Sequence, residues 1–245
     1  MLAAAKVLLW ALVGLYDETL LLLKANVVWF IASLPLGVPL VLILAGLMPA
    51  DGQAGSGGLL LPLMVTGLLL LLIPNPASLG LYRLAAVMQR KETPPWDVFW
   101  HATRDNVGLG LRLFAIGLIG LVILAVNATF YLNAEPRALR ALAVVWFYLG
   151  LFWLTLQLYL GPLAMLLAER RLLALYRRAA LLVVAHPIYS FSFVLAIALV
   201  ILLSVPVVPL YPALAMAFVA LVGTRALHEL RQKYDPQAGA DEDPA

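Results

Sequence analysis

The chain has 245 residues, of which 64% are hydrophobic and only 12% are charged, with a formal net charge of +3. A soluble globular domain is about 45–50% apolar and about 25% charged, so this composition predicts an all-α, polytopic integral membrane protein with a helical bundle. It excludes a soluble enzyme and a nucleic-acid-binding domain, and the lack of any cysteine excludes disulfides, thiolate metal sites and cysteine nucleophiles.

Runs of about 20 apolar residues, the length that crosses roughly 30 Å of hydrocarbon, predict six transmembrane helices in one membrane domain over residues 1–233. The second is expected to break at 74–76, where two prolines flank Asn75. The fifth and sixth are short and joined by a Pro-rich link, so a single re-entrant hairpin is the alternative for them. Residues 234–245 are predicted to be a disordered acidic tail. The predicted spans are 27–48, 59–89, 107–132, 139–168, 188–204 and 207–226.

Three segments between or before the spans have the pattern of amphipathic helices that lie along a membrane surface. They cover residues 2–25, a segment that starts with Trp96 after Pro94-Pro95, and residues 169–178. Each precedes a pair of spans, and Asn26, Asn106 and Pro187 stand where the next helix could begin. The pattern is compatible with three repeated units of a surface helix plus a hairpin, over 2–90, 94–168 and 169–233. Ordinary punctuation of a hairpin-built protein is the alternative.

The distribution of basic residues predicts the orientation of the chain. In the six-span arrangement, all of the 16 Lys and Arg residues except Arg137 and Arg140 fall on one side. Because cytoplasmic loops retain basic residues, we expect a multi-pass protein of the plasma (inner) membrane with both termini in the cytoplasm.

Sequence motifs for catalysis or metal binding are missing. His101, His186 and His228 lie in three separate places, none at a metal-ligand spacing from another histidine or an acid. No Asp or Glu lies in the hydrocarbon part of any predicted span, which weighs against a proton-driven transporter. The sequence therefore predicts a protein that is not an enzyme and binds no metal or cofactor.

The polar residues inside the spans are the candidates for a cavity or for packing. Asn127 and Gln157 are each an amide on a long apolar helix, and interhelical hydrogen bonds are the expected use of such groups. The break formed by Pro74, Asn75 and Pro76 removes two backbone donors, which membrane proteins tolerate where protein or a water-filled cavity replaces them. A plain kink is the favoured interpretation; a polar cavity joining Asn75 to Asn127 or Gln157 is the alternative.

A second set of candidates consists of basic residues on the predicted cytoplasmic side, which could contact a partner or lipid headgroups. In the segment 169–178 they form one basic face of a helix, opposite Ala179 and Val183. The candidates are Arg83, Arg90, Lys91, Arg170, Arg171, Arg177 and Arg178.

The stretch from 76 to 106 resembles a known family. It contains Pro-Ala-Ser-Leu-Gly-Leu-Tyr at 76–82, then a basic patch, then Trp-Asp-Val-Phe-Trp at 96–100 and Arg-Asp-Asn at 104–106. This order is similar to that of the YesL-like bacterial membrane proteins, a family of unknown function in which a Gly usually stands in place of Asn75. The resemblance implies a five- or six-span plasma-membrane protein, in some members associated with carbohydrate uptake systems, and it supplies no catalytic residue.

These observations favour a non-enzymatic integral membrane protein that is an accessory component of a transport system. The expected partners are the lipid bilayer and another membrane transport subunit, and no nucleic acid. A small-solute transporter or channel with a cavity at the broken span is one alternative, and a lipid-binding or membrane-organising protein is the other.

Overall fold

The computed structural model describes residues 19–48, 58–89, 94–135, 137–167, 170–187 and 210–234, and within these ranges the chain forms helices and no strand. Three helical segments are long and apolar enough to cross a membrane: α2 (Thr19–Gly46), α7 (Val107–Leu132) and Arg137–Leu166. The bent pair of α4 (Leu60–Leu72) and α5 (Pro76–Met88) makes a fourth if it counts as one span. The described residues therefore contain three to four such helices, fewer than the six predicted.

The first helix corrects the prediction of a surface helix that ends before a span at residue 27. Helix α2 begins at Thr19 and runs without interruption past Asn26, which was expected to start a new helix. Asn26 is fully buried, and its Oδ1 accepts a hydrogen bond from the backbone N–H of Ala217 at 2.8 Å. The side chain therefore joins two distant helices instead of capping one, and no helix-breaking residue stands between Lys24 and Val27. Residues 2–18 of the predicted surface helix lie outside the described residues.

The predicted break in the second span is confirmed. Helix α4 ends at Leu72, α5 begins at Pro76, and the two axes differ in direction by 48°. Because Pro74 and Pro76 have no N–H, a continuous helix here would leave two carbonyls without donors. The chain therefore bends at this point and restarts.

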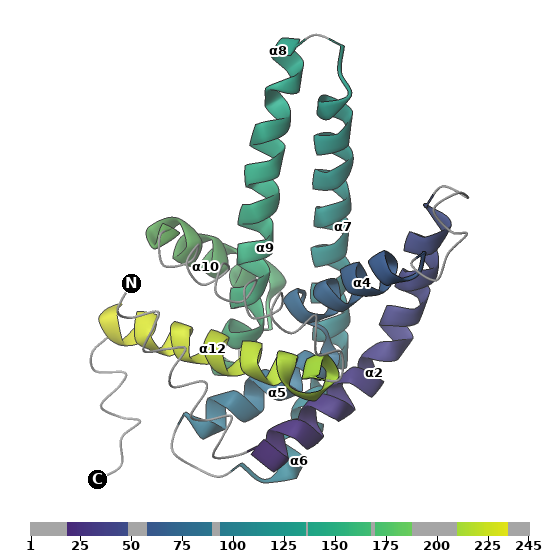
Figure 1. The fold of residues 1–245 in the computed structure, drawn as a ribbon. Helices are drawn as coiled ribbons and strands as arrows, with labels where there is room; N and C mark the ends of the chain where they lie inside the picture. Colours follow the sequence, from purple (N-terminus) through teal and green to yellow (C-terminus); the bar gives the residue numbers. More distant parts are fainter. Residues whose placement is uncertain are drawn as a thin grey trace.

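Helix α6 (Trp96–Asp105) and α7 follow the predicted boundaries, and Asn106 separates them. The sequence suggested that the Asn106 side chain would cap the start of α7, but it does not. Its Nδ2 donates instead to the carbonyl of Ala102 at 2.8 Å, and so supplies a donor to the C-terminal end of α6. After a turn, α8 (Arg137–Arg140) and α9 (Leu142–Leu166) return alongside α7. Figure 1 shows α7 and α9 as a tall hairpin whose tip, with α8, stands clear of the other helices.

Helix α12 (Leu210–Tyr234) lies across the base of this hairpin and packs on α2, α5 and α9 (Figure 1). Its middle, including Met216, Leu221 and Thr224, is buried, as expected of a stretch without charged residues. It covers most of the predicted sixth span. The predicted fifth span, residues 188–204, and the tail from residue 235 lie outside the described residues. The six-span count and the threefold repeat stay predictions.

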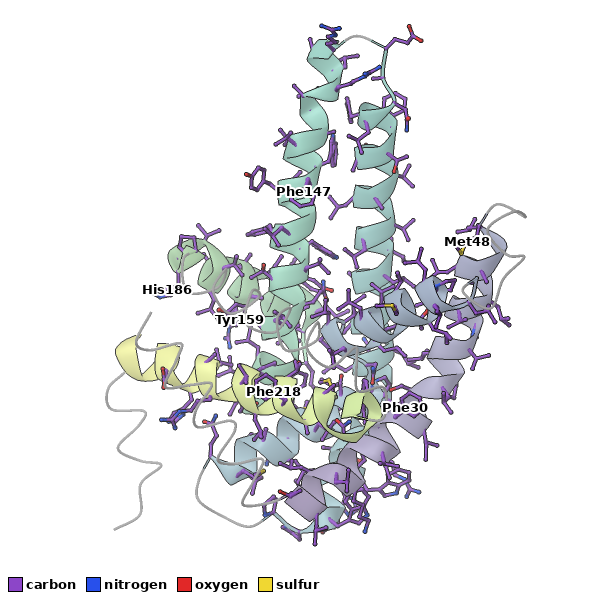
Figure 2. All side chains as sticks on the ribbon, viewed as in Figure 1. Phe30, Met48, Phe147, Tyr159, His186 and Phe218 are labelled. Carbon is purple, nitrogen blue, oxygen red and sulfur yellow. The ribbon has the colours of Figure 1, made fainter. Side chains whose placement is uncertain are left out.

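The core of the bundle is formed where α5, α9 and α12 meet. Tyr82 of α5 is fully buried there, with its ring between Gly161 of α9 and Gly223 of α12. A Cβ atom at Gly161 would overlap the ring, and one at Gly223 would lie 3.5 Å from it. The two glycines thus allow a large aromatic side chain to fill the space between two helices. Figure 2 shows Tyr159 and Phe218 in the same region.

Candidate functional site

The break between α4 and α5 is closed by its own side chains. The Oδ1 atom of Asn75 accepts from the backbone N–H of Ser78 at 3.0 Å, and the Ser78 Oγ accepts from the N–H of Asn75 at 2.7 Å. This reciprocal pair is a capping box at the start of α5. The Nδ2 atom of Asn75 donates to the carbonyl of Leu70 at 3.2 Å, which replaces the donor that Pro74 lacks. The buried Asn75 amide is therefore a structural cap.

Helix α7 lies directly against this break. A Cβ atom at Gly110 would be 2.5 Å from the backbone nitrogen of Pro76 and 2.9 Å from the carbonyl carbon of Asn75. Only a residue without a side chain allows the backbones to approach this closely. The packing of α7 against residues 75–76 therefore supports the bend, in addition to the hydrogen bonds of Asn75 and Ser78.

Gln157 of α9 lies close to the break, because it and Ile73 both lie against Gly117 of α7. A Cβ atom at Gly117 would be 3.0 Å from the Gln157 Oε1 atom and 2.6 Å from the Cγ2 atom of Ile73, the last residue before the prolines. Gln157 is completely buried, and neither atom of its amide has a hydrogen-bond partner. An unpaired buried polar group costs about 1–3 kcal/mol.

Helix α10 (Leu172–Ala185) brings a second unpaired group to Gln157. The hydroxyl of Tyr176 is buried beside the Gln157 amide but makes no hydrogen bond of good geometry with it. Burial raises the pKa of Tyr176, and the polar contact with Gln157 lowers it. The ring of Tyr176 stacks on Trp153 with 5.5 Å between centroids, and the Trp153 Nε1 donates to the carbonyl of Gly117 at 3.0 Å. Sequence reasoning identified Gln157 but missed Tyr176, because nothing in the sequence shows that α10 folds back onto α9. It also missed Trp153, although the spacing of four residues places Trp153 and Gln157 on one face of α9.

Asn127 is not part of this group. Its Nδ2 donates to the carbonyl of Ile123 at 2.7 Å, a bond within α7 and not between two helices. Asn127 is 17 residues beyond Gly110, the residue that contacts the break, which is about 25 Å along a helix. The structure therefore brings Gln157 near the break and places Asn127 far from Asn75.

The basic candidates lie on exposed positions where they are described. Arg83 is an exposed residue on the otherwise buried α5, and Arg177 and Arg178 are exposed on α10. Ala179 and Val183, on the opposite face of α10, are buried as predicted. Arg170 and Arg171 precede this helix and are also exposed. Arg90 and Lys91 lie outside the described residues.

Two further cations are held by aromatic rings of α6. The Nζ atom of Lys24 lies 4.3 Å from the ring centroid of Trp96, and the guanidinium of Arg104 lies 4.7 Å from that of Trp100. Trp96 also stacks on the buried Phe99 at 5.1 Å, so the two tryptophans differ: Trp96 faces the protein, and Trp100 is 38% exposed.

In the part of the chain that the structure describes, no three His, Cys, Asp or Glu side chains are grouped so that they could hold a metal ion. No family model, characterised protein or solved structure matches the chain. The resemblance to the YesL-like proteins therefore stays a prediction. The long apolar helices indicate a membrane-embedded protein and do not indicate a family.

Proposed function

We propose that this chain is a non-enzymatic integral membrane protein that acts as an accessory component of an uptake system, with the outer half of the α7/α9 hairpin as its contact surface within the membrane. The observation that carries the proposal is the exposure of this outer half. Its large apolar side chains are not covered by any other part of the chain that the structure describes, and Phe147 is 69% exposed (Figure 2). An apolar surface of this kind fits lipid or another membrane helix.

The charges at the two ends of the hairpin support the proposed topology. Arg137 and Arg140 are exposed at the tip, whereas Arg104 and Arg112 are exposed at its base. The 26 residues of α7 extend about 39 Å, more than the roughly 30 Å of hydrocarbon. This separation fits a plasma-membrane protein whose base and both termini are cytoplasmic. The six-span arrangement with residues 188–204 as an additional span belongs to the same proposal.

The geometry gives less support to a transporter with a cavity at Asn75, because both ends of that amide are used in capping and Asn127 is remote from it. A lipid-binding role is the second candidate, and one observation favours it. Helix α10 exposes Leu173, Leu181 and Val184 beside its arginines, and Leu173 is 84% exposed. Exposed apolar and basic side chains on one helix suit a membrane surface that carries anionic lipid.

Photocrosslinking in the source cells tests the accessory role. A photoreactive phenylalanine derivative replaces exposed Phe147 in one variant and buried Phe114 in a matched control. The proposal expects a discrete crosslinked product at position 147, absent at 114, whose second component is a subunit of a transport system. It also expects slower uptake of that system's carbohydrate when this chain is deleted.

Three results would contradict the proposal. Crosslinks to lipid alone at position 147 would favour the lipid-binding alternative. Solute flux through the purified chain reconstituted by itself would favour the transporter. Unchanged uptake after deletion, with a crosslinked transport subunit, would show that the contact has no role in uptake.

A further inference from the structure

Gln157 and Tyr176 form a buried polar pair that the packing of the protein leaves incomplete. A neutral amide has two N–H donors and one carbonyl acceptor, and a phenol both donates and accepts. None of the buried polar atoms of these two side chains has a hydrogen-bond partner. Even one bond between them would leave at least one N–H of the amide without an acceptor. Such groups in a folded protein are usually completed by a water molecule or a ligand.

The surroundings of the pair favour a neutral ligand. Gly117, Ile73 and the indole of Trp153 adjoin it, and none of them carries a charge. The one N–H of the indole is already donated to the Gly117 carbonyl. Arg177 and Arg178, which follow Tyr176 in the chain, are exposed on α10. The amide and the phenol therefore have donors and acceptors to offer but no charge to balance an ion.

The position of Tyr176 gives the pair a route to the outside. Its hydroxyl is buried, whereas the residue as a whole is only half-buried. The side chain thus reaches from the partly exposed α10 to the amide of α9. Movement of this side chain is the route by which solvent would reach the buried hydroxyl.

We propose that Gln157 and Tyr176 form a binding site for a small uncharged polyol, whose hydroxyl groups both donate and accept hydrogen bonds. In this site the Gln157 amide accepts a hydrogen bond from one hydroxyl of the polyol and donates to another. The Tyr176 hydroxyl forms a further hydrogen bond with the polyol. The inference does not depend on the accessory role, because the site lies at the base of the hairpin and not on its exposed outer half.

The experiment uses the full chain in lipid nanodiscs with its nine tyrosines replaced by 3-fluorotyrosine. The fluorine resonance of Tyr176 is the one that disappears in Tyr176→Phe. Glycerol is the probe, and 1,2-dimethoxyethane, a diether with the same number of heavy atoms and no hydroxyl, is the control solute. Gln157→Leu removes the amide at similar size, and Gln157→Met replaces it if the leucine variant does not fold.

The proposal expects the Tyr176 resonance to shift with glycerol along a saturating curve, to stay in place with the diether, and to lose the glycerol response in the Gln157 variant. Failure to shift with glycerol would show that the pair holds water alone or no ligand, and would overturn the proposal. A linear shift shared by the other tyrosines would identify a bulk solvent effect. An unchanged response in Gln157→Leu would remove Gln157 from the site. None of these results alters the crosslink expected at Phe147.

Discussion

Replacement of Asn75 by alanine tests whether the break in the second span is a sealed structural joint. The Asn75 side chain makes two buried hydrogen bonds, one to the N–H of Ser78 and one to the carbonyl of Leu70. Loss of an N-cap costs about 1 kcal/mol, and a buried carbonyl left without a donor costs about 1–3 kcal/mol. We therefore expect Asn75→Ala to lower the free energy of unfolding by about 2–4 kcal/mol, which corresponds to a fall in Tm of about 5–15 °C.

Asn127→Ala is the matched control. It removes the same amide from an equally apolar helix, but the only hydrogen bond lost is to the carbonyl of Ile123 in the same helix, near the surface. A cost within about 0.5 kcal/mol is expected at such a position. Both variants are compared with the parent by thermal unfolding in the same nanodiscs. Equal Tm values for the two variants would refute the reasoning that the Asn75 hydrogen bonds stabilise the break between α4 and α5.

Three further predictions follow from the packing, the charges and the buried phenol. Gly161→Ala should destabilise the chain by about 1–3 kcal/mol through overpacking against Tyr82, and most of that cost should vanish in a Tyr82→Leu background, measured as a double-mutant cycle of Tm values. Arg177→Gln with Arg178→Gln should weaken retention of anionic lipid by roughly thirtyfold, at about 1 kcal/mol for each arginine near the surface; native mass spectrometry measures it, and equal loss in the tip pair Arg137→Gln with Arg140→Gln would contradict it. Because burial raises the pKa of Tyr176, the folded protein keeps this proton at a pH where the unfolded chain loses it, so stability should fall as pH rises through about 10; Tyr176→Phe should show a smaller fall, and an identical pH dependence would contradict the prediction.

The broken span, α6 and α7 could be predicted from local sequence because their boundaries are set by local chemistry. Pro74 and Pro76 interrupt a helix wherever they stand, and Asn75 followed by Ser78 forms a cap from neighbouring residues alone. The start of α7 after Asn106 was likewise visible. The partner of the Asn106 side chain could not be predicted. It donates to the carbonyl of Ala102 in α6, whereas the sequence equally allows a bond to the start of α7.

Features that depend on contacts between distant helices could not be predicted. Asn26 has the local pattern of a helix cap, but α2 continues through this position. The Asn26 side-chain oxygen accepts a hydrogen bond from the N–H of Ala217, which is 191 residues away in the sequence. Gln157 was recognised as an amide on a long apolar helix, whereas Tyr176 joins it only because α10 folds back onto α9. The hydropathy of residues 207–226 suggested a span, but it gave no sign that the middle of α12 is enclosed by other helices. Periodicity identifies apolar helices; it does not identify which neighbour covers them.

Cysteine accessibility tests the central claim, that the α7/α9 hairpin crosses the membrane with its tip outside, most directly. The chain has no cysteine of its own, so Ala138→Cys at the tip, Val122→Cys in the outer half and Asp97→Cys in α6 each carry one reactive thiol, all at exposed positions. A membrane-impermeant maleimide should label Ala138→Cys in intact cells, Asp97→Cys only after the membrane is opened, and Val122→Cys in neither case. Labelling of Val122→Cys from water, or of Ala138→Cys and Asp97→Cys from the same side, would contradict the account.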